Sequence, residues 1–351
     1  MNAINFPIAH SRPWINHADK EAVASVLHSG MISRGEKTIE FEEKVGEYLG
    51  LRRGIACASG TDALVLALQT LRIGSASQVI LPTYVCHNLL NAVLSVGATP
   101  QFCDVNETGV VSVDTIRPHI TKKTAAIIAV HIFGHPCDIP SLQSLGVPVI
   151  EDACQAFGLS INGKMAGSLG EIGFLSFHAT KCLTTGEGGM LVSRDEALLN
   201  KARFLASNSH GASFKSSSCF SDMQAALGLS QLKRYDEFLS RRHRIQKIYL
   251  EAMSNVKQAT PRSAESQFLF RMVLAVQPKF CNLQRLLLKQ GVHVRKGVDE
   301  LLHRLVRKPD SGFPNAKALY ERSLSIPFYP ALTNASVATI CKAIKLVFHE
   351  N

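Results

Sequence analysis

Residues 173–193 read GFLSFHATKCLTTGEGGMLVS. This pattern predicts two strands, Gly173–Phe177 and Met190–Ser193, joined by a loop that contains Lys181 and a run of glycines. A lysine held at the edge of a sheet can form a Schiff base once desolvation or a neighbouring positive charge depresses its pKa. A surface lysine in a turn is the commoner alternative, so the surrounding sequence has to distinguish the two.

Short apolar runs alternate with helical patterns from Arg53 to these strands. The segments Thr61–Leu71 and Asn88–Val96 carry apolar residues at helical spacing. Such alternation is typical of a mostly parallel sheet with helices on both faces, so we predict an α/β fold with one large, mostly parallel sheet. The further expected strands are Gly54–Ala58, Val79–Leu81, Gln101–Val105, Ala125–Val130 and Val147–Glu151.

The pattern changes at Asp222, where a long amphipathic helix is expected through about Ala252. A small α+β unit should follow, with strands at Gln267–Val276 and Val292–Arg295 and helices at Leu283–Lys289 and Ser336–Val347. We therefore predict a large domain with an N-terminal arm over residues 1–240 and a small C-terminal domain over residues 241–351. The serine-rich segment Ser207–Ser218 is expected to be a mobile surface loop.

The composition is that of an ordinary folded chain: 351 residues, 46% hydrophobic and 19% charged, which excludes disorder, collagen and coiled coil. The net charge of +10 favours anionic small molecules such as phosphates and nucleotides without naming a partner. The nine cysteines form no Cys-x-x-Cys pair, the N-terminus has no secretory pattern, and no run reaches about 18 apolar residues. We expect reduced cysteines and a cytoplasmic protein.

The motif Ser59-Gly60-Thr61-Asp62 follows an expected strand and opens an expected helix. Free N–H groups at the start of a helix suit a phosphate, although Ser59 can equally be a simple helix cap. Ile150-Glu151-Asp152 places two carboxylates at the end of another strand, where doubly wound sheets bind their ligands. The nearby Cys154 and Gln155 do not complete a metal site, so no metal is predicted.

Three features follow one another on one sheet: a phosphate-binding helix start, an acid at a strand end and a lysine in a loop. Together they predict a binding site for pyridoxal 5'-phosphate. These motifs closely resemble the DegT/DnrJ/StrS family of sugar aminotransferases, which have the fold-type-I architecture of aspartate aminotransferase. The resemblance covers nearly the whole chain. The matching blocks are Ser33-Arg34-Gly35 with Glu40-Phe41-Glu42, Ala58–Leu64, Glu151–Ala156, Ser176–Lys181, Gly186–Gly189, Gln224–Gly228 and Leu324–Pro330.

The resemblance implies two catalytic residues. Lys181 matches the lysine that holds the cofactor as an internal aldimine and, once released, moves the proton between substrate and cofactor. Asp152 matches the acid that pairs with the pyridine nitrogen and keeps it protonated, so that the ring accepts electrons. Gln155 resembles the residue near the phenolic oxygen of the ring. The positions that match those around the phosphate are Gly60, Thr61, Asp62 and Ser176.

Two segments depart from the family pattern. Many relatives place an aromatic side chain over the pyridine ring from the segment that matches Pro82–Val93, and Cys86 stands at that position here, with Tyr84 close by. Relatives also carry Asn-Tyr-Arg-Met before the helix at Gln224, where this chain has Ser217-Ser218-Cys219-Phe220. A contact of that segment with the phosphate of a neighbouring subunit is therefore in doubt, and serine hydroxyls or Lys215 are the possible substitutes.

The reaction implied by the resemblance is a two-stage transamination, in which glutamate aminates the cofactor and the cofactor then aminates a keto sugar. Family precedent favours a nucleotide-linked 3-keto or 4-keto hexose, and a homodimer with the active site at the subunit interface. No nucleic acid or membrane partner is expected. Arg34, Lys215 and Arg295 are candidates for anion contacts, with a solvated surface charge as the alternative for each. No cation could be singled out for the carboxylate of the donor.

Three alternatives remain open at the level of sequence. A dehydratase branch of the family replaces the lysine with histidine, which Lys181 argues against. An enzyme that aminates a cyclitol or another cyclic ketone would carry the same motifs, and a noncatalytic regulatory or scaffold protein could keep the fold and bind the cofactor without turnover. His131, His135 and His178 also lie near the predicted site, and structural roles are favoured for them.

Overall fold

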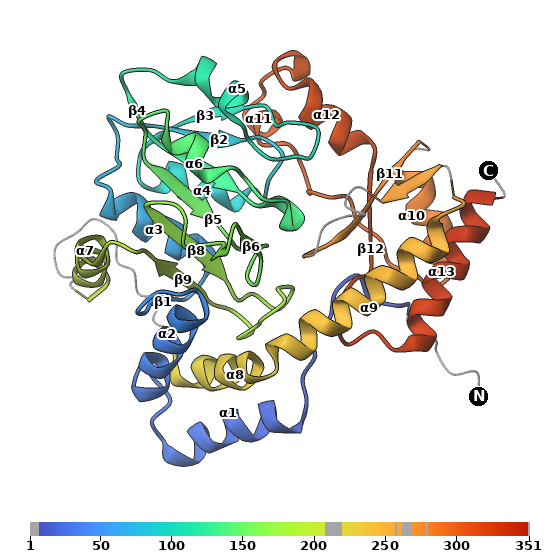
Figure 1. Ribbon diagram of the computed structural model, residues 1–351, viewed down its shortest axis with the longest axis horizontal. Helices are drawn as coiled ribbons and strands as arrows, with labels where there is room; N and C mark the ends of the chain where they lie inside the picture. Colours follow the sequence, from blue (N-terminus) through green and yellow to red (C-terminus); the bar gives the residue numbers. More distant parts are fainter. Residues whose placement is uncertain (1–6, 208–219, 257, 262–267, 278–279, 350–351) are drawn as a thin grey trace.

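The protein is described here from a computed structural model, which covers residues 7–207, 220–256, 258–261, 268–277 and 280–349 (Figure 1). A seven-stranded sheet lies at its centre in the order β1-β9-β8-β5-β4-β2-β3. Every neighbouring pair is parallel except the two that involve β9, which is antiparallel to β1 and β8. The predicted α/β fold with a large, mostly parallel sheet is confirmed. Its strands are β1 (Ile55–Cys57), β2 (Gln78–Pro82), β3 (Thr99–Cys103), β4 (Thr124–Val130), β5 (Val149–Asp152), β8 (Ile172–Ser176) and β9 (Gly189–Val192).

Both faces of this sheet are buried, as the apolar runs of its strands predict. In β9, Leu191 packs into one hydrophobic core together with α3 (Gly60–Thr70) and α7 (Glu196–Ser207). Its neighbours Met190 and Val192 pack into a second core together with α2 (Glu36–Tyr48) and α8 (Asp222–Lys233). Successive side chains of a strand point to opposite faces, which is why one strand serves two cores. The remaining elements of this part are α1 (His17–Ser29), α4 (Asn88–Ser95), α5 (Val113–Ile116), α6 (Ile139–Gln143), β6 (Ser160–Ile161), β7 (Lys164–Met165) and the 3₁₀ turns Arg117–His119 and Ile132–Gly134.

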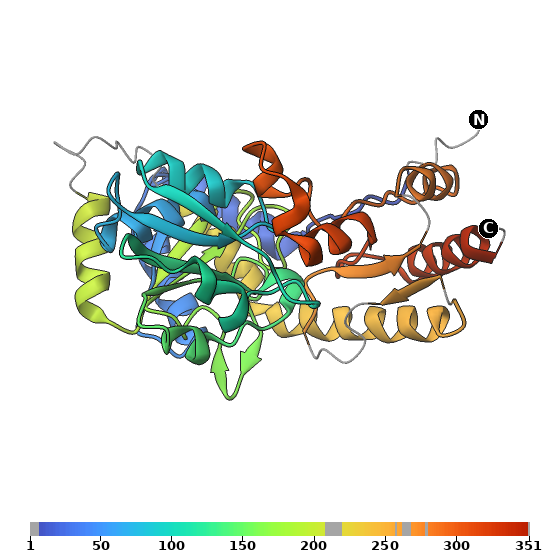
Figure 2. The same ribbon diagram turned by 90° about the horizontal axis from the view of Figure 1, so that it is seen from above.

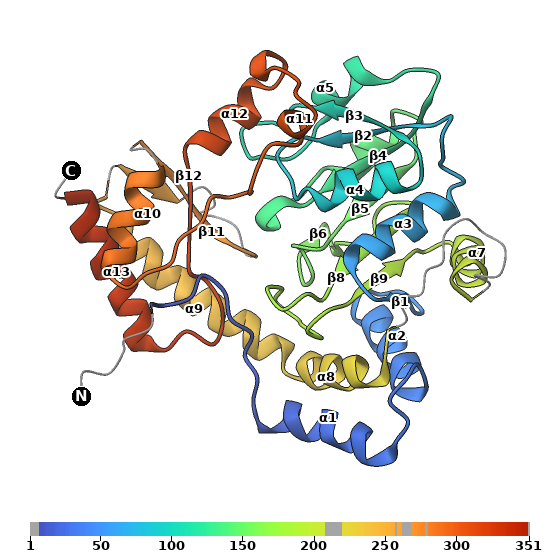
Figure 3. The same ribbon diagram turned by 180° about the vertical axis from the view of Figure 1, so that it is seen from behind.

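A smaller unit is connected to the large sheet by α9 (Tyr235–Met253), which spans the space between the two parts (Figure 3). The sequence predicted one helix from Asp222 to about Ala252, but the helix breaks at Arg234, between α8 and α9. The unit contains an antiparallel three-stranded sheet in the order β10-β11-β12, and Figure 2 shows α9 and α13 beside it. Its elements are β10 (Ala259–Pro261), β11 (Met272–Val276), α10 (Phe280–Lys289), β12 (Ser323–Ile326) and α13 (Asn334–His349).

The prediction of a strand at Val292–Arg295 is wrong. The backbone of this segment exchanges hydrogen bonds with Ile8 of the N-terminal arm through Gly291 and His293, and with Ser325 of β12 through Arg295. It changes partner within a few residues, so it forms only isolated bridges instead of a ladder.

One late segment of the chain returns to the large sheet. Residues 301–321 include α11 (Leu302–Leu305), the 3₁₀ turn Asp310–Gly312 and α12 (Pro314–Glu321), and they contribute Leu302, Phe313 and Leu319 to the same core as α3. The division at residue 240 stays a prediction, because this later segment packs with the large sheet. No helix within the described ranges is long and apolar enough to cross a bilayer.

Candidate active site

A cleft lies at the carboxyl ends of the central strands and faces the small sheet. Seven predicted site residues line it: Gly60, Thr61, Cys86, Asp152, Gln155, Ser176 and Lys181. We call residues 59–61, 152–155 and 176–181 the strand-end wall. Residues 270–271 and 295–299 form the opposite side, which we call the small-sheet wall. The strand-end wall is local to one sheet, whereas the small-sheet wall comes from residues about 90 positions or more after Lys181.

Two adjacent carboxylates at the end of β5 have different surroundings because their side chains point to opposite faces of the sheet. Asp152 lines the cleft, and its Oδ1 accepts a hydrogen bond of 2.9 Å from the N–H of Cys154. Burial raises the pKa of Asp152 above its ordinary value, while the hydrogen bonds from Cys154 and the charge of Lys181 oppose the rise. A buried carboxylate with an incomplete set of partners is a good acceptor for a cationic ligand.

Glu151 lies on the other face and is fully buried. It accepts hydrogen bonds from the backbone N–H groups of Gly167, Leu169 and Gly170 at 2.7, 2.7 and 2.9 Å. Nε2 of His131 is 2.9 Å from its Oε1, and Nδ1 of His131 accepts from the N–H of Cys137, so Nε2 carries the proton. Burial would raise the pKa of Glu151, but the hydrogen bonds from His131 and the backbone outweigh it and lower the pKa. His131 therefore serves the core and not the cleft.

The start of α3 forms the floor of the cleft. Ser59 caps the helix, because its Oγ accepts from the N–H of Asp62 and donates to the carboxylate of Asp62 at 2.8 Å. Among the described residues, no acceptor binds the N–H groups of Gly60 and Thr61. A Cβ atom on Gly60 would lie 2.9 Å from Cβ of Ser176, so only glycine allows α3 to start this close to β8. The cap and the predicted phosphate-binding helix start coexist, but Asp62 serves the cap and does not line the cleft.

The loop after β8 positions Lys181 in the cleft. Its turn is closed by the bond from the N–H of Lys181 to the carbonyl oxygen of His178, at 2.8 Å. The ring of His178 contacts the hydroxyl of Thr180 at 2.9 Å and lies 3.5 Å from the carboxylate of Glu187. Nζ of Lys181 lies 5.1 Å from the ring centroid of Phe270, on the small-sheet wall. The lysine thus stands between the two walls, and His178 shapes its loop.

Gln155 also points into the cleft with a defined orientation. Its Oε1 accepts a hydrogen bond of 2.8 Å from the N–H of Phe133. The amide nitrogen is consequently the end left for the cleft, as a donor. Phe133 has a positive φ of 56°, so the backbone turn at residues 132–134 is what directs its N–H toward Gln155.

The two segments that depart from the family pattern are placed differently in the structure. Cys86 is exposed and lines the cleft, so its thiol is accessible there. Tyr84 is buried and packs edge-on against Phe133, with ring centroids 6.1 Å apart, and it does not line the cleft. Lys215 and Ser217–Cys219 lie outside the described residues. Phe220 is buried and stacks on Phe41.

Of the predicted anion contacts, Arg34 is engaged elsewhere, because its guanidinium lies 2.7 Å from the buried Glu42. Arg295 does line the cleft. Arg271, beside it on the small-sheet wall, was not predicted. The available signal was a lone charge in the otherwise apolar strand predicted at Gln267–Val276. His135 does not line the cleft.

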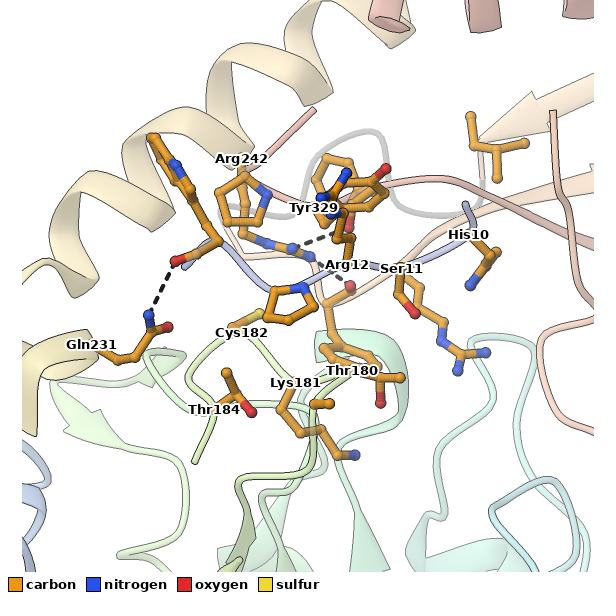
Figure 4. A pocket seen from close by; sticks show the side chains of 18 residues that line it. His10, Ser11, Arg12, Thr180, Lys181, Cys182, Thr184, Gln231, Arg242 and Tyr329 are labelled. Atoms are coloured by element: carbon orange, nitrogen blue, oxygen red, sulfur yellow. Dashed lines mark hydrogen bonds between the residues drawn. The ribbon is translucent and has the colours of Figure 1, made fainter. Parts of the chain in front are cut away.

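A second hollow lies on the far side of Lys181, between the N-terminal arm and the small sheet (Figure 4). Residues of the arm, from His10 to Trp14, form one side of it. Arg242 from α9 donates there to the carbonyl oxygens of Leu269, Phe270 and Phe328. This buried guanidinium joins the long helix to the segment that carries the small-sheet wall.

Residues 13–345 match the sequence model of the DegT/DnrJ/EryC1/StrS aminotransferase family. The chain belongs to this family. Its motifs are therefore those of an aminotransferase, and the resemblance seen in the sequence is confirmed.

Individual relatives agree over most of their length. The chain is 32% identical over 355 residues to GDP-perosamine synthase of Escherichia coli O157:H7, covering 95% of this chain and 96% of that protein. It is 31% identical to a UDP-N-acetyl-3-dehydro-alpha-D-glucosamine 3-aminotransferase of Acidithiobacillus ferrooxidans, covering 93% of each. Among solved structures, the aminotransferase TlmJ of Streptoalloteichus hindustanus superimposes with a TM-score of 0.91 at 28% identity, over 98% of this chain and 99% of that one.

Proposed function

We propose that the protein is a pyridoxal 5'-phosphate-dependent aminotransferase that transfers the amino group of an amino acid, glutamate in the first instance, to a keto sugar linked to a nucleotide. The observation that carries this proposal is the convergence of Lys181, Asp152 and the open helix start at Gly60–Thr61 on one cleft. Family membership supports the reaction class. Two relatives are named for work on GDP- and UDP-linked sugars, which supports the substrate class.

The described residues fit the cofactor. The two N–H groups at the start of α3 and the hydroxyl of Ser176 would hold its phosphate, where the helix dipole also favours an anion. The Asp152 carboxylate would take the protonated ring nitrogen, which restores the charge partner that this buried acid lacks. The amide nitrogen of Gln155 would donate to the phenolic oxygen. When bound, the group supplies an electron sink for the carbanion formed at the substrate carbon.

Lys181 is the group that acts on the substrate. Its amine would anchor the cofactor and, when free, would accept and return the proton at the reacting carbon from a position beside Phe270. Asp152 would hold the protonated ring nitrogen of the cofactor, and the loop of His178 keeps the lysine near the cleft. Phe270 of the small-sheet wall lies beside the amine.

We also propose a homodimer with the cleft completed at the subunit interface. The turn between α1 and α2 and the helix ends that flank it expose four large apolar side chains: Leu27, Met31, Ile32 and Ile39. Met31 is 73% exposed, and an exposed apolar group of this size supports a protein interface. Sedimentation of the Met31→Asp variant tests this interface. Arg285→Gln, which changes an exposed residue of α10, is the control. A dimeric Met31→Asp protein would count against this surface.

The reaction is tested by the absorbance of the protein loaded with pyridoxal 5'-phosphate. L-Glutamate should shift the absorbance, and a keto sugar from a panel of UDP- and GDP-linked 3-keto and 4-keto hexoses should reverse the shift. A response to a cyclitol ketone alone would replace the sugar with that substrate class. A loaded protein that responds to no amino acid would favour the noncatalytic alternative and would contradict the proposal.

A further inference from the structure

The small-sheet wall carries two guanidinium groups and faces Lys181 across the cleft. Arg271 and Arg295 both line the cleft. No carboxylate of the described residues comes within 4.0 Å of either group. Asp299 acts on Arg271 electrostatically, without forming an ion pair. Uncompensated positive charge in a partly buried site is stabilised by an incoming anion.

Arg271 is held in position by its surroundings. Its Nη1 donates to the carbonyl oxygen of Gly297 at 2.9 Å, and its guanidinium lies 5.7 Å from the ring of Phe270 and 5.9 Å from the ring of Phe133. Arg242 binds the carbonyl oxygens of Leu269 and Phe270, which fixes the backbone that leads into Arg271. Because Nη1 makes this hydrogen bond, the other N–H groups of the Arg271 guanidinium are left to bind a ligand.

The charges around Arg271 also favour the binding of an anion. Burial lowers the pKa of Arg271, the charge of Asp299 opposes this, and the positive charge of Arg295 reinforces it. His10, which also adjoins the two arginines, has its pKa lowered to about 3 by burial and by the charges of Arg271, Arg295 and His293. His10 therefore stays neutral near pH 7 and adds no charge of its own.

The position of Arg271 selects the kind of anion. The Lys181 amine and the Arg271 guanidinium lie 5.1 and 5.7 Å from the ring centroid of Phe270, so both groups occupy the same part of the cleft. In an amino acid, the carboxylate is bonded to the carbon that carries the amino group. When that carbon reacts at Lys181, the carboxylate must therefore also lie close to Lys181. The diphosphate of a nucleotide sugar is several bonds away from a keto carbon. We propose that Arg271, assisted by Arg295, binds the carboxylate next to the amino group of the amino-acid donor.

This inference rests on the proposed function, and two binding probes separate it from that function. Succinate carries carboxylates but no amino group, so its affinity can be measured by calorimetry without turnover. UDP and GDP report on the nucleotide diphosphate in the same way. Arg271→Gln and Arg295→Gln should each weaken succinate binding by about 10- to 100-fold, the loss of charge-assisted hydrogen bonds. Both should leave the affinity for UDP and GDP within about 3-fold.

Kinetics supply a second readout. The L-glutamate concentration that half-saturates the absorbance change should rise by the same factor in both variants, and Arg271→Lys should recover part of the loss because it keeps the charge without the fork. Arg285→Gln on α10 is the matched control, since it removes an exposed charge outside the cleft. Arg295 is itself exposed, so its variant should fold even where Arg271→Gln does not.

Unchanged succinate affinity in both cleft variants would overturn the inference. Loss of UDP or GDP binding in place of succinate binding would also overturn it, because the pair would then hold the nucleotide. A wild-type enzyme that binds succinate through Arg271 but ignores every amino acid would contradict the proposed function and still support the carboxylate site.

Discussion

The strand-end wall and the small-sheet wall of the cleft differ in how their polar groups are compensated. On the strand-end wall, the hydrogen-bond partners are near neighbours in the chain: Ser59 bonds Asp62, and Cys154 bonds Asp152. On the small-sheet wall, Arg271 and Arg295 have no carboxylate partner among the described residues. Under the proposed function, the strand-end wall would hold the cofactor, and the small-sheet wall would have a positive charge left for an exchanging substrate to neutralise.

The largest effect should come from Lys181, the group between the two walls. Lys181→Ala should lower transamination by about 10⁴-fold or more, because it would remove the proposed anchor of the cofactor and the proposed general base. Borohydride should no longer fix the cofactor to the protein, as measured by mass spectrometry. Trapping that persists in a variant with an unchanged circular dichroism spectrum would assign the covalent link to another residue.

Asp152 should have the next largest effect. Asp152→Asn keeps the shape of the side chain but removes the charge that stabilises a protonated ring nitrogen, and we expect a loss of about 10²- to 10³-fold in the rate of the glutamate half-reaction. Stopped-flow absorbance measures this rate directly. A rate within about 3-fold of wild type would mean that the acid is a structural residue like its neighbour.

Glu151 provides the contrast on the opposite face of the same strand. Glu151→Gln places an amide nitrogen against backbone N–H donors in a buried site, so the free energy of unfolding should fall by about 3 kcal/mol. Urea denaturation measures the fall. The rate per folded molecule should stay near that of wild type, and a selective loss of rate with stability intact would show that the two carboxylates share one task.

The smallest effect concerns His10 beside the small-sheet wall. Its pKa is about 3 in the folded protein against an ordinary value of 6.5, so below pH 6.5 the unfolded chain takes up a proton that the folded chain does not. This stabilisation is complete above pH 6.5 and is lost as the pH falls toward 3, about 2 kcal/mol of it by pH 5. His10→Gln should flatten the dependence of unfolding free energy on pH between 7 and 5. An equal slope in both proteins would argue against a buried neutral His10.

Most of the strand-end wall was predictable because its signals are local. A strand followed by Ser-Gly-Thr-Asp opens α3, and a strand that ends in Glu-Asp carries both carboxylates, so periodicity and turn residues place Gly60, Thr61 and Asp152 at one edge. Asp62 was the exception, because a capping bond that the motif also allows takes its side chain away from the cleft. Arg271 was missed, because nothing in its own segment indicates that β11 will face Lys181.

By itself, the sequence determined the α/β sheet, the order of its strands along the chain and the residues at their carboxyl ends, because apolar periodicity and glycine turns act over a few residues. Only the tertiary structure decided that Glu151 and His131 bond each other on the opposite face of the sheet, and that a second sheet brings two arginines opposite Lys181. Those outcomes depend on contacts between segments far apart in the chain, such as Arg242 with Leu269 and Phe328, which no local pattern specifies.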